Sequence, residues 1–146
     1  MKYEQPLHSH SPEQTLEIAG LLAQQHPKAL VLLHGGLGAG KTLFARGFAR
    51  GLSIDCHVSS PSYTLMNEYR NGAVTLYHLD LYRINCFEEV IDIGLFEILQ
   101  TGNPCLVEWA ERVVELQKLP HLEVCIEQPD PESELERLIS WTWKEP

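Results

Sequence analysis

The segment GGLGAGKT, residues 35–42, constrains the fold of this chain more than any other feature. It matches the pattern G-x-x-x-x-G-K-[ST] at every fixed position, and it lies between an apolar run at 28–35 and a helical pattern at about 42–52. The apolar run is typical of a strand that is buried on both faces of a sheet. A strand, a glycine-rich loop and a helix in this order are the context of a phosphate-binding P-loop, so the sequence predicts an α/β fold built around one.

The residue types of this loop suit a nucleotide phosphate. Its glycines let the backbone curl so that N–H groups converge on an anion, and the helix that begins near Lys41 adds its positive dipole end. Lys41 can place an ammonium against the β- and γ-phosphates, and the Thr42 hydroxyl can ligate Mg²⁺. The residues that we expect to hold the nucleotide here are Gly35, Gly38, Ala39, Gly40, Lys41, Thr42 and Leu43.

Two acidic residues each follow an apolar strand pattern. Asp80 comes directly after VTLYHL, and Glu108 comes directly after PCLV. In sheets of this type the carboxyl ends of the strands face the phosphate loop, so either acid can hold Mg²⁺ through a water while the other orients an attacking water. A solvated acid at the start of a loop is the alternative interpretation for each of them.

The remaining patterns alternate between helix and strand. Ser11 and Gln14 form a capping box with Pro12 at the first helical position, and Asn71-Gly72 predicts a two-residue hairpin turn. The other expected elements are a helix up to Pro27, strands within 63–80, one helix over 87–102, a strand at 104–109, a helix at 111–119 and a closing strand pair around 129–131. Together these elements predict one domain, 1–146, with a helix-covered mixed sheet that has a parallel centre and antiparallel additions.

Composition limits the function classes. The chain has 20 acidic and 11 basic residues, a net charge of −9, and no basic stripe of the kind that neutralises nucleic-acid phosphates. We therefore expect any role in nucleic-acid metabolism to act through another protein. No run approaches the ~18 to 20 apolar residues of a membrane span, and the N-terminus has no signal-peptide core, so a cytoplasmic location without membrane contact is expected. The cysteines have no C-x-x-C spacing and the histidines no H-x-x-x-H spacing, so no metal site from these residues is expected.

The loop alone leaves the fate of the phosphate open. No N-K-x-D signature is present, which disfavours a GTPase, and no arginine-rich lid appears between Arg112 and Arg137, which disfavours a small-molecule kinase. A phosphotransferase with an acceptor other than water remains an alternative. A binding module that is gated by nucleotide, with negligible turnover, is another.

Four motifs together carry a family resemblance. HGGLGAGKT, SSPSYTL, YHLDLYR and LVEWAE occur in this order, at similar spacings, in the TsaE family, also called YjeE, and the resemblance covers roughly residues 11–128. It implies a P-loop NTPase-like three-layer α/β sandwich that binds ATP and Mg²⁺ and hydrolyses ATP weakly alone. It also implies action on a heterodimer of the TsaD transferase and its paralogue TsaB, which modifies tRNA with threonylcarbamoyladenosine. Hydrolysis would reset that complex, and tRNA would be contacted only indirectly.

The same resemblance implies roles for individual residues. Thr42 and Glu108 resemble the Mg²⁺ ligands, and Asp80 resembles the catalytic acid, acting with Lys41 and Glu108. The segment 59–65 resembles a switch, with Ser62 where the family more often has threonine.

Three further residues are implied with alternatives. Trp109 and Glu111 follow at the edge of the site, although Trp109 also suits the core. Arg137 resembles a late arginine near the nucleotide, with Glu136 where glycine is usual, and a solvated surface arginine is the alternative. The interpretation of His78 and Tyr82 is that they pack or orient.

Overall fold

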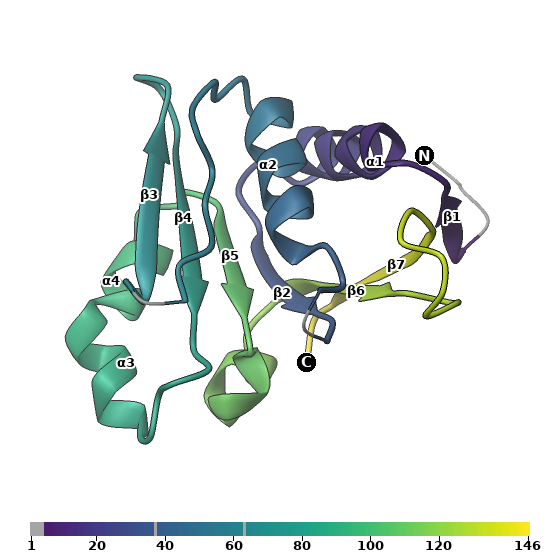
Figure 1. The fold of residues 1–146 in the computed structure, drawn as a ribbon. Coiled ribbons are helices and arrows are strands. Elements are labelled where there is room, and N and C mark those ends of the chain that lie inside the picture. Colours follow the sequence, from purple (N-terminus) through teal and green to yellow (C-terminus); the bar gives the residue numbers. More distant parts are fainter. Residues whose placement is uncertain (1–4, 37, 63) are drawn as a thin grey trace.

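The structure is a computed structural model that describes residues 5–36, 38–62 and 64–146. Over these residues the chain forms one sheet with the strand order β1-β7-β6-β2-β5-β4-β3, flanked by helices (Figure 1). The strands are β1 (Leu7–Ser9), β2 (Leu30–His34), β3 (Met66–Arg70), β4 (Thr75–Asp80), β5 (Cys105–Glu108), β6 (His121–Glu127) and β7 (Arg137–Lys144). The helices are α1 (Pro12–Gln25), α2 (Lys41–Gly51), α3 (Phe87–Ile93), α4 (Leu95–Gln100) and the 3₁₀ helices η1 (Ala110–Arg112) and η2 (Val114–Lys118).

The centre of the sheet is parallel and its flanks are antiparallel. Strand β2 runs parallel to both β5 and β6, and β4 runs parallel to β5. Strands β3, β7 and β1 join as antiparallel additions. This arrangement confirms the predicted mixed sheet, and the four parallel strands bring their carboxyl ends to one edge.

Helices cover both faces of the sheet. Helices α1 and α2 lie on one face, where Phe44 and Phe48 pack in a cluster that includes Val31 (Figure 1). On the other face, Val90 and Leu95 of α3 and α4 pack in a second cluster with alternate residues of β2 and β5. These two clusters confirm the three-layer sandwich, because a strand with side chains in both must be buried on both faces. None of the helices in the described part of the chain is long and apolar enough to cross a membrane.

Helix α1 begins at the predicted N-cap, Ser11, with Pro12 at its first position. The Ser11 hydroxyl accepts a hydrogen bond from the Gln14 N–H at 3.2 Å, and the Gln14 side chain accepts one from the His10 N–H at 2.6 Å. The first bond is the N-cap contact of the predicted capping box, whereas the second goes to the residue before the N-cap and not to the Ser11 N–H. Helix α1 then packs closely on α2, because a Cβ at Gly47 would lie 2.6 Å from the Leu16 carbonyl oxygen.

Three predicted elements differ from the structure. The single helix predicted at 87–102 is wrong, because Gly94 adopts a φ of 88° and divides it into α3 and α4. The helix predicted at 111–119 is two short 3₁₀ helices, η1 and η2. The hairpin turn lies one residue later than predicted, because the Asn71 N–H bonds to the Val74 carbonyl and leaves Gly72 and Ala73 as its central residues. The edge strand β1 was not predicted at all.

Candidate functional site

The glycine-rich loop connects the end of β2 to the start of α2, as its sequence predicts. Gly38 and Gly40 adopt φ values of 75° and 103°, a region that is unfavourable for residues with a Cβ. Gly40 is the N-cap of α2 and provides no side-chain hydrogen bond to the first turn. The loop therefore leads directly into a helix N-terminus whose N–H groups lack a capping side chain, which favours an anion.

A cavity of about 300 Å³ lies against this loop and gathers most of the predicted site. Its lining comes from the loop, from the start of α2, from the segment after residue 58 and from the ends of β4 and β5. The lining residues are Gly38, Ala39, Gly40, Lys41, Thr42, Ser60, Ser62, Asp80, Glu108 and Trp109. Residues that are up to 71 positions apart in the sequence thus share one hollow.

The two predicted acids are neighbours in the sheet. Asp80 and Glu108 are register partners at the carboxyl ends of the parallel strands β4 and β5, and Leu33 of β2 pairs with Glu108 from the other side. Each carboxylate residue is only 4% exposed. The alternative interpretation of either residue as a solvated acid is therefore wrong.

Glu108 is held by two basic side chains. Its Oε1 lies 3.6 Å from Lys41 Nζ, and its Oε2 lies 2.6 Å from Nε2 of His78, which is fully buried. Because a carboxylate only accepts hydrogen bonds, His78 donates through Nε2–H. His78 Nδ1 is buried and has no hydrogen-bond partner among the described residues. His78 is thus an orienting group for Glu108, in agreement with the interpretation drawn from the sequence.

Asp80 is bound to the segment that resembles a switch. Its Oδ1 accepts a hydrogen bond from the Tyr82 N–H at 2.9 Å, and its Oδ2 accepts one from the Ser62 hydroxyl at 3.2 Å. Ser62 in turn lies 2.6 Å from the Ser60 hydroxyl. The Ser62 hydroxyl therefore links the segment 59–62 directly to the acid. Tyr63 lies outside the described residues.

Trp109 is both a site residue and a packing residue. Its ring lies over the Lys41 ammonium, with Nζ 4.7 Å from the ring centroid, and it also packs against the second hydrophobic cluster. The Trp109 backbone has a φ of 58°, which costs a non-glycine residue about 1–2 kcal/mol. Tyr82 packs on the same ring at 4.9 Å between centroids. Trp109, which directly follows Glu108, thus combines a left-handed backbone conformation with a ring that contacts Lys41.

Two predicted residues lie beside a different cavity. A second hollow, of about 550 Å³, is lined by Gly35 and Glu111 among others, and it shares Ala39 and Trp109 with the first cavity. Glu111 also lies 3.4 Å from His34 Nδ1. Leu43, in the first turn of α2, is half-buried and lines neither cavity.

Arg137 reaches the loop from the start of β7. Its Nε donates to the Ala39 carbonyl at 2.9 Å, and its Nη2 donates to the Gly38 carbonyl at 3.2 Å. Arg137 is half-buried, so its interpretation as a solvated surface arginine is wrong. It binds the loop through the carbonyl oxygens of Gly38 and Ala39, a contact that no local pattern in the sequence indicates.

Fold and loop together define a P-loop NTPase-like α/β protein. The profile of the family described as "Threonylcarbamoyl adenosine biosynthesis protein TsaE" matches residues 9–139, and the chain belongs to this TsaE family. It is 42% identical over 133 residues to the tRNA threonylcarbamoyladenosine biosynthesis protein TsaE of Bacillus subtilis, covering 90% of this chain and 81% of that protein. Identity to the TsaE of Treponema pallidum is 43% over 98 residues, covering 67% and 70%. The crystal structure of Bacillus subtilis YdiB superposes with a TM-score of 0.77 at 35% identity, covering 98% of this chain and 87% of that one.

Proposed function

We propose that this protein binds ATP with Mg²⁺ at the loop and hydrolyses it as an accessory factor of tRNA threonylcarbamoyladenosine biosynthesis in the cytoplasm. The observation that carries the proposal is the shared cavity, in which the loop faces both strand-end carboxylates. Its volume of about 300 Å³ is at the lower end of the ~300–1,000 Å³ of small-molecule sites, which suits a phosphate tail in an open groove.

The donor set of the cavity fits Mg²⁺. The hydroxyl of Thr42 and the carboxylates of Glu108 and Asp80 offer only oxygen, the ligand atom that Mg²⁺ prefers, and no thiol or imidazole lines this cavity among the residues that the structure describes. Thr42 and Glu108 would hold the ion. When bound, Mg²⁺ neutralises charge on the phosphate oxygens.

The side chains of the chain itself divide the remaining work. Lys41, buried between Glu108 and the Trp109 ring, is held in place to attract the terminal phosphates. Asp80 accepts a hydrogen bond from the attacking water and fixes its direction toward the γ-phosphorus. The Tyr82 N–H and the Ser62 hydroxyl hold Asp80 for that task.

The accessory role is supported by charge and by the switch segment. A net charge of −9 disfavours a direct grip on tRNA, so the protein acts on a TsaD–TsaB-type transferase heterodimer. The Ser60–Ser62–Asp80 hydrogen bonds connect the exposed segment near residue 60 to the catalytic acid. Hydrolysis would change that segment and thereby reset the transferase between rounds of modification.

The decisive experiment is tRNA modification with the purified transferase heterodimer at limiting concentration. We expect many rounds of modification with the wild-type protein or with Lys28→Ala, an exposed lysine that serves as the matched control. We expect about one round per transferase with Lys41→Ala or without this protein. Many rounds without it would contradict the accessory role. Many rounds with a non-hydrolysable ATP analogue would favour a nucleotide-gated binding module, and transfer of labelled γ-phosphate to an acceptor other than water would favour a phosphotransferase.

A further inference from the structure

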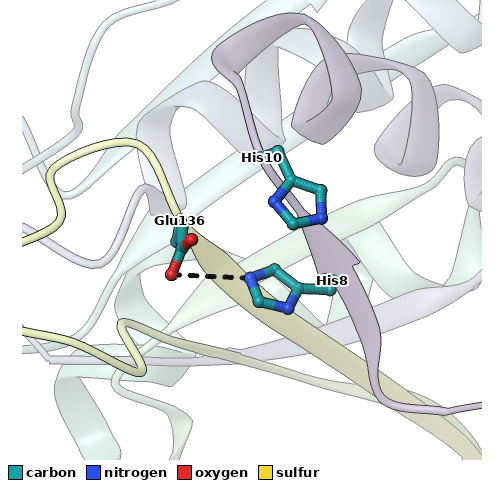
Figure 2. A group of neighbouring side chains, drawn as sticks. All are labelled: His8, His10 and Glu136. Carbon is teal, nitrogen blue, oxygen red and sulfur yellow. Dashed lines mark ion pairs between the residues drawn. The ribbon is translucent and has the colours of Figure 1, made fainter.

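Three side chains outside the nucleotide cavity form a compact group at the edge of the sheet. His8 and His10 come from β1 and the residue after it, and Glu136 directly precedes β7. Figure 2 shows the three side chains gathered on one side of the β1–β7 pair. One nitrogen of each imidazole and one carboxylate oxygen lie within 4.8 Å of one another.

Strand register brings the group together. Strand β1 pairs antiparallel with β7, with His8 opposite Leu138 and Ser9 opposite Arg137, so continuation of the pairing places His10 opposite Glu136. Alternate residues of a strand share a face, and directly opposite residues share it too. His8, His10 and Glu136 therefore lie on the outer face.

The inner face anchors this pair of strands. Ser9 is fully buried, and its hydroxyl lies 2.7 Å from the Thr15 hydroxyl and donates to the Ser11 carbonyl at 2.9 Å. Arg137 binds the phosphate loop from the same face. The contacts of Ser9 therefore fix the backbone between His8 and His10, while the two imidazoles remain exposed.

The contacts within the group are close but individually weak. His8 Nε2 lies 3.7 Å from a Glu136 oxygen, and the two imidazole rings stack with their centroids 4.2 Å apart and their planes at 14°. An exposed ion pair contributes about 0–1 kcal/mol to stability, so the contact between His8 and Glu136 adds little to the stability of the fold.

We propose that His8, His10 and Glu136 bind a divalent transition-metal ion, with Zn²⁺ as the ion that fits best. Two imidazole nitrogens and one carboxylate oxygen are a known zinc ligand set that leaves a fourth position for water. With bonds of about 2.0–2.1 Å, the ligand atoms of one tetrahedral zinc lie about 3.3 Å apart. The ligand atoms of His8, His10 and Glu136 lie within 4.8 Å of one another, and small rotations of the exposed side chains can bring them to that separation. Imidazole donors disfavour Mg²⁺ and Ca²⁺, which prefer oxygen.

A bound ion would connect β1 to the start of β7. Glu136 precedes Arg137, and the Glu136 carbonyl accepts a hydrogen bond from Arg137 Nη1 at 2.7 Å. The ion would thus brace the same short backbone segment from which Arg137 holds the loop. The proposed zinc site requires no nucleotide, so zinc binding can be tested independently of the proposed ATPase activity.

Zinc titration of the full chain by calorimetry tests the site. Cys56 and Cys86 are exposed and should be changed to serine in every sample, so that thiols do not supply ligands. We expect one zinc per chain with a micromolar or lower Kd. His10→Ala and Glu136→Gln should each weaken binding at least tenfold, whereas Glu134→Gln, which removes the same charge from an exposed position of the same loop, should leave the Kd within twofold.

Stability provides a second readout. Excess zinc should raise the Tm of the chain with serine at 56 and 86 and of its Glu134→Gln variant, and should leave the Tm of Glu136→Gln unchanged, because a ligand of the folded state stabilises it by mass action. Circular dichroism without zinc checks that each variant is folded. Absence of zinc binding in the chain with intact His8, His10 and Glu136 would overturn the proposal, and so would equal affinities for Glu136→Gln and Glu134→Gln.

Discussion

Charged residues occur in two contrasting settings in this molecule. At the carboxyl ends of the central parallel strands and at the start of α2, Lys41, Asp80 and Glu108 are each less than 10% exposed. Lys41 and the buried His78 contact Glu108, and Asp80 binds the Ser62 hydroxyl and the Tyr82 N–H. On the antiparallel flanks, Lys144 pairs with Glu123 and Arg70 pairs with Glu68, with the two basic side chains 50% and 66% exposed. The same residue types thus form a buried cluster at the centre of the sheet and solvent-exposed ion pairs on its flanks.

The difference teaches what each setting contributes. Burying a charge costs several kcal/mol of desolvation, and the attraction within a pair offsets this cost only with good geometry, so the central cluster is poor evidence of stabilisation. The exposed pairs cost little and contribute about 0–1 kcal/mol. A cluster that is costly to bury and that lines the same cavity as the glycine-rich loop is more easily explained by chemistry than by folding.

Lys41 provides the largest expected effect within the central cluster. Lys41→Ala removes an ammonium that the Trp109 ring and Glu108 hold in place, and it leaves the Glu108 carboxylate facing the phosphates without compensation. We expect ATP affinity, measured by calorimetry, to fall at least 100-fold. Lys28→Ala should leave it within twofold, and equal affinities for the two variants would remove Lys41 from the binding site.

Asp80 separates binding from chemistry. Asp80→Asn keeps the shape of the side chain and loses the charge that orients a water, so we expect kcat for ATP hydrolysis to fall about 100-fold while the Kd for ATP changes less than about fivefold. Asp92→Asn, at an exposed position of α3, is the matched control. An unchanged kcat in Asp80→Asn would transfer the catalytic role to Glu108.

His78 tests the structural cost of the cluster. Its loss would leave one Glu108 oxygen buried without its hydrogen-bond donor, so we expect His78→Ala to lower the free energy of unfolding by about 3 kcal/mol in urea titrations. His57→Ala, an exposed histidine, should change it by less than about 0.5 kcal/mol. Adding Glu108→Gln to His78→Ala should cost less than the two single changes summed, because the hydrogen bond between the two residues is lost only once. Full additivity of the two changes would mean that the pair is not coupled.

The sequence predicts the central region better than the flanks. The glycine-rich loop between a strand and a helix, the helix start at Ser11 and the buried strands rest on local patterns with a direct physical cause, and all three are found in the structure. Gly94 breaks the helix predicted at 87–102 by adopting a positive φ. The sequence does not show this in advance, because a glycine inside a helical pattern can adopt either a helical or a positive φ. The three-residue strand β1 is defined by its pairing with β7, which lies about 130 residues away.

The candidate site shows the same limit. Asp80 and Glu108 could be predicted because strand ends carry a positional rule. The contacts of Arg137 with the loop and of His78 with Glu108 depend on sheet register and on side-chain direction, which no local spacing encodes. The H-x-x-x-H spacing sought in the sequence does not detect the pair His8 and His10. The spacing H-x-x-x-H places two ligands on one face of a helix, whereas in a strand the equivalent spacing is H-x-H.

Glu123 on β6 provides the smallest expected effect and tests the exposed setting. The hydrogen bond from Lys144 is the main cause that lowers the pKa of Glu123 from its ordinary value of 4.5, with the charges of Lys144, His34 and His121 adding to it and burial opposing it. Because the folded-state pKa lies below the unfolded one, the pair contributes stability above about pH 4.5, and this contribution is lost as the pH falls through the folded-state pKa.

We therefore expect Glu123→Gln to lower the free energy of unfolding by about 0.5 kcal/mol at pH 7, after solvent screening, and by nothing measurable near pH 3. Urea titrations at both pH values would measure this, and 1 M salt should halve the difference at pH 7. Glu115→Gln, an exposed acid on η2, is the control and should change nothing. A loss above about 2 kcal/mol, or one that grows on acidification, would mean that this flank pair behaves like the buried cluster, and the contrast between the two settings would then fail.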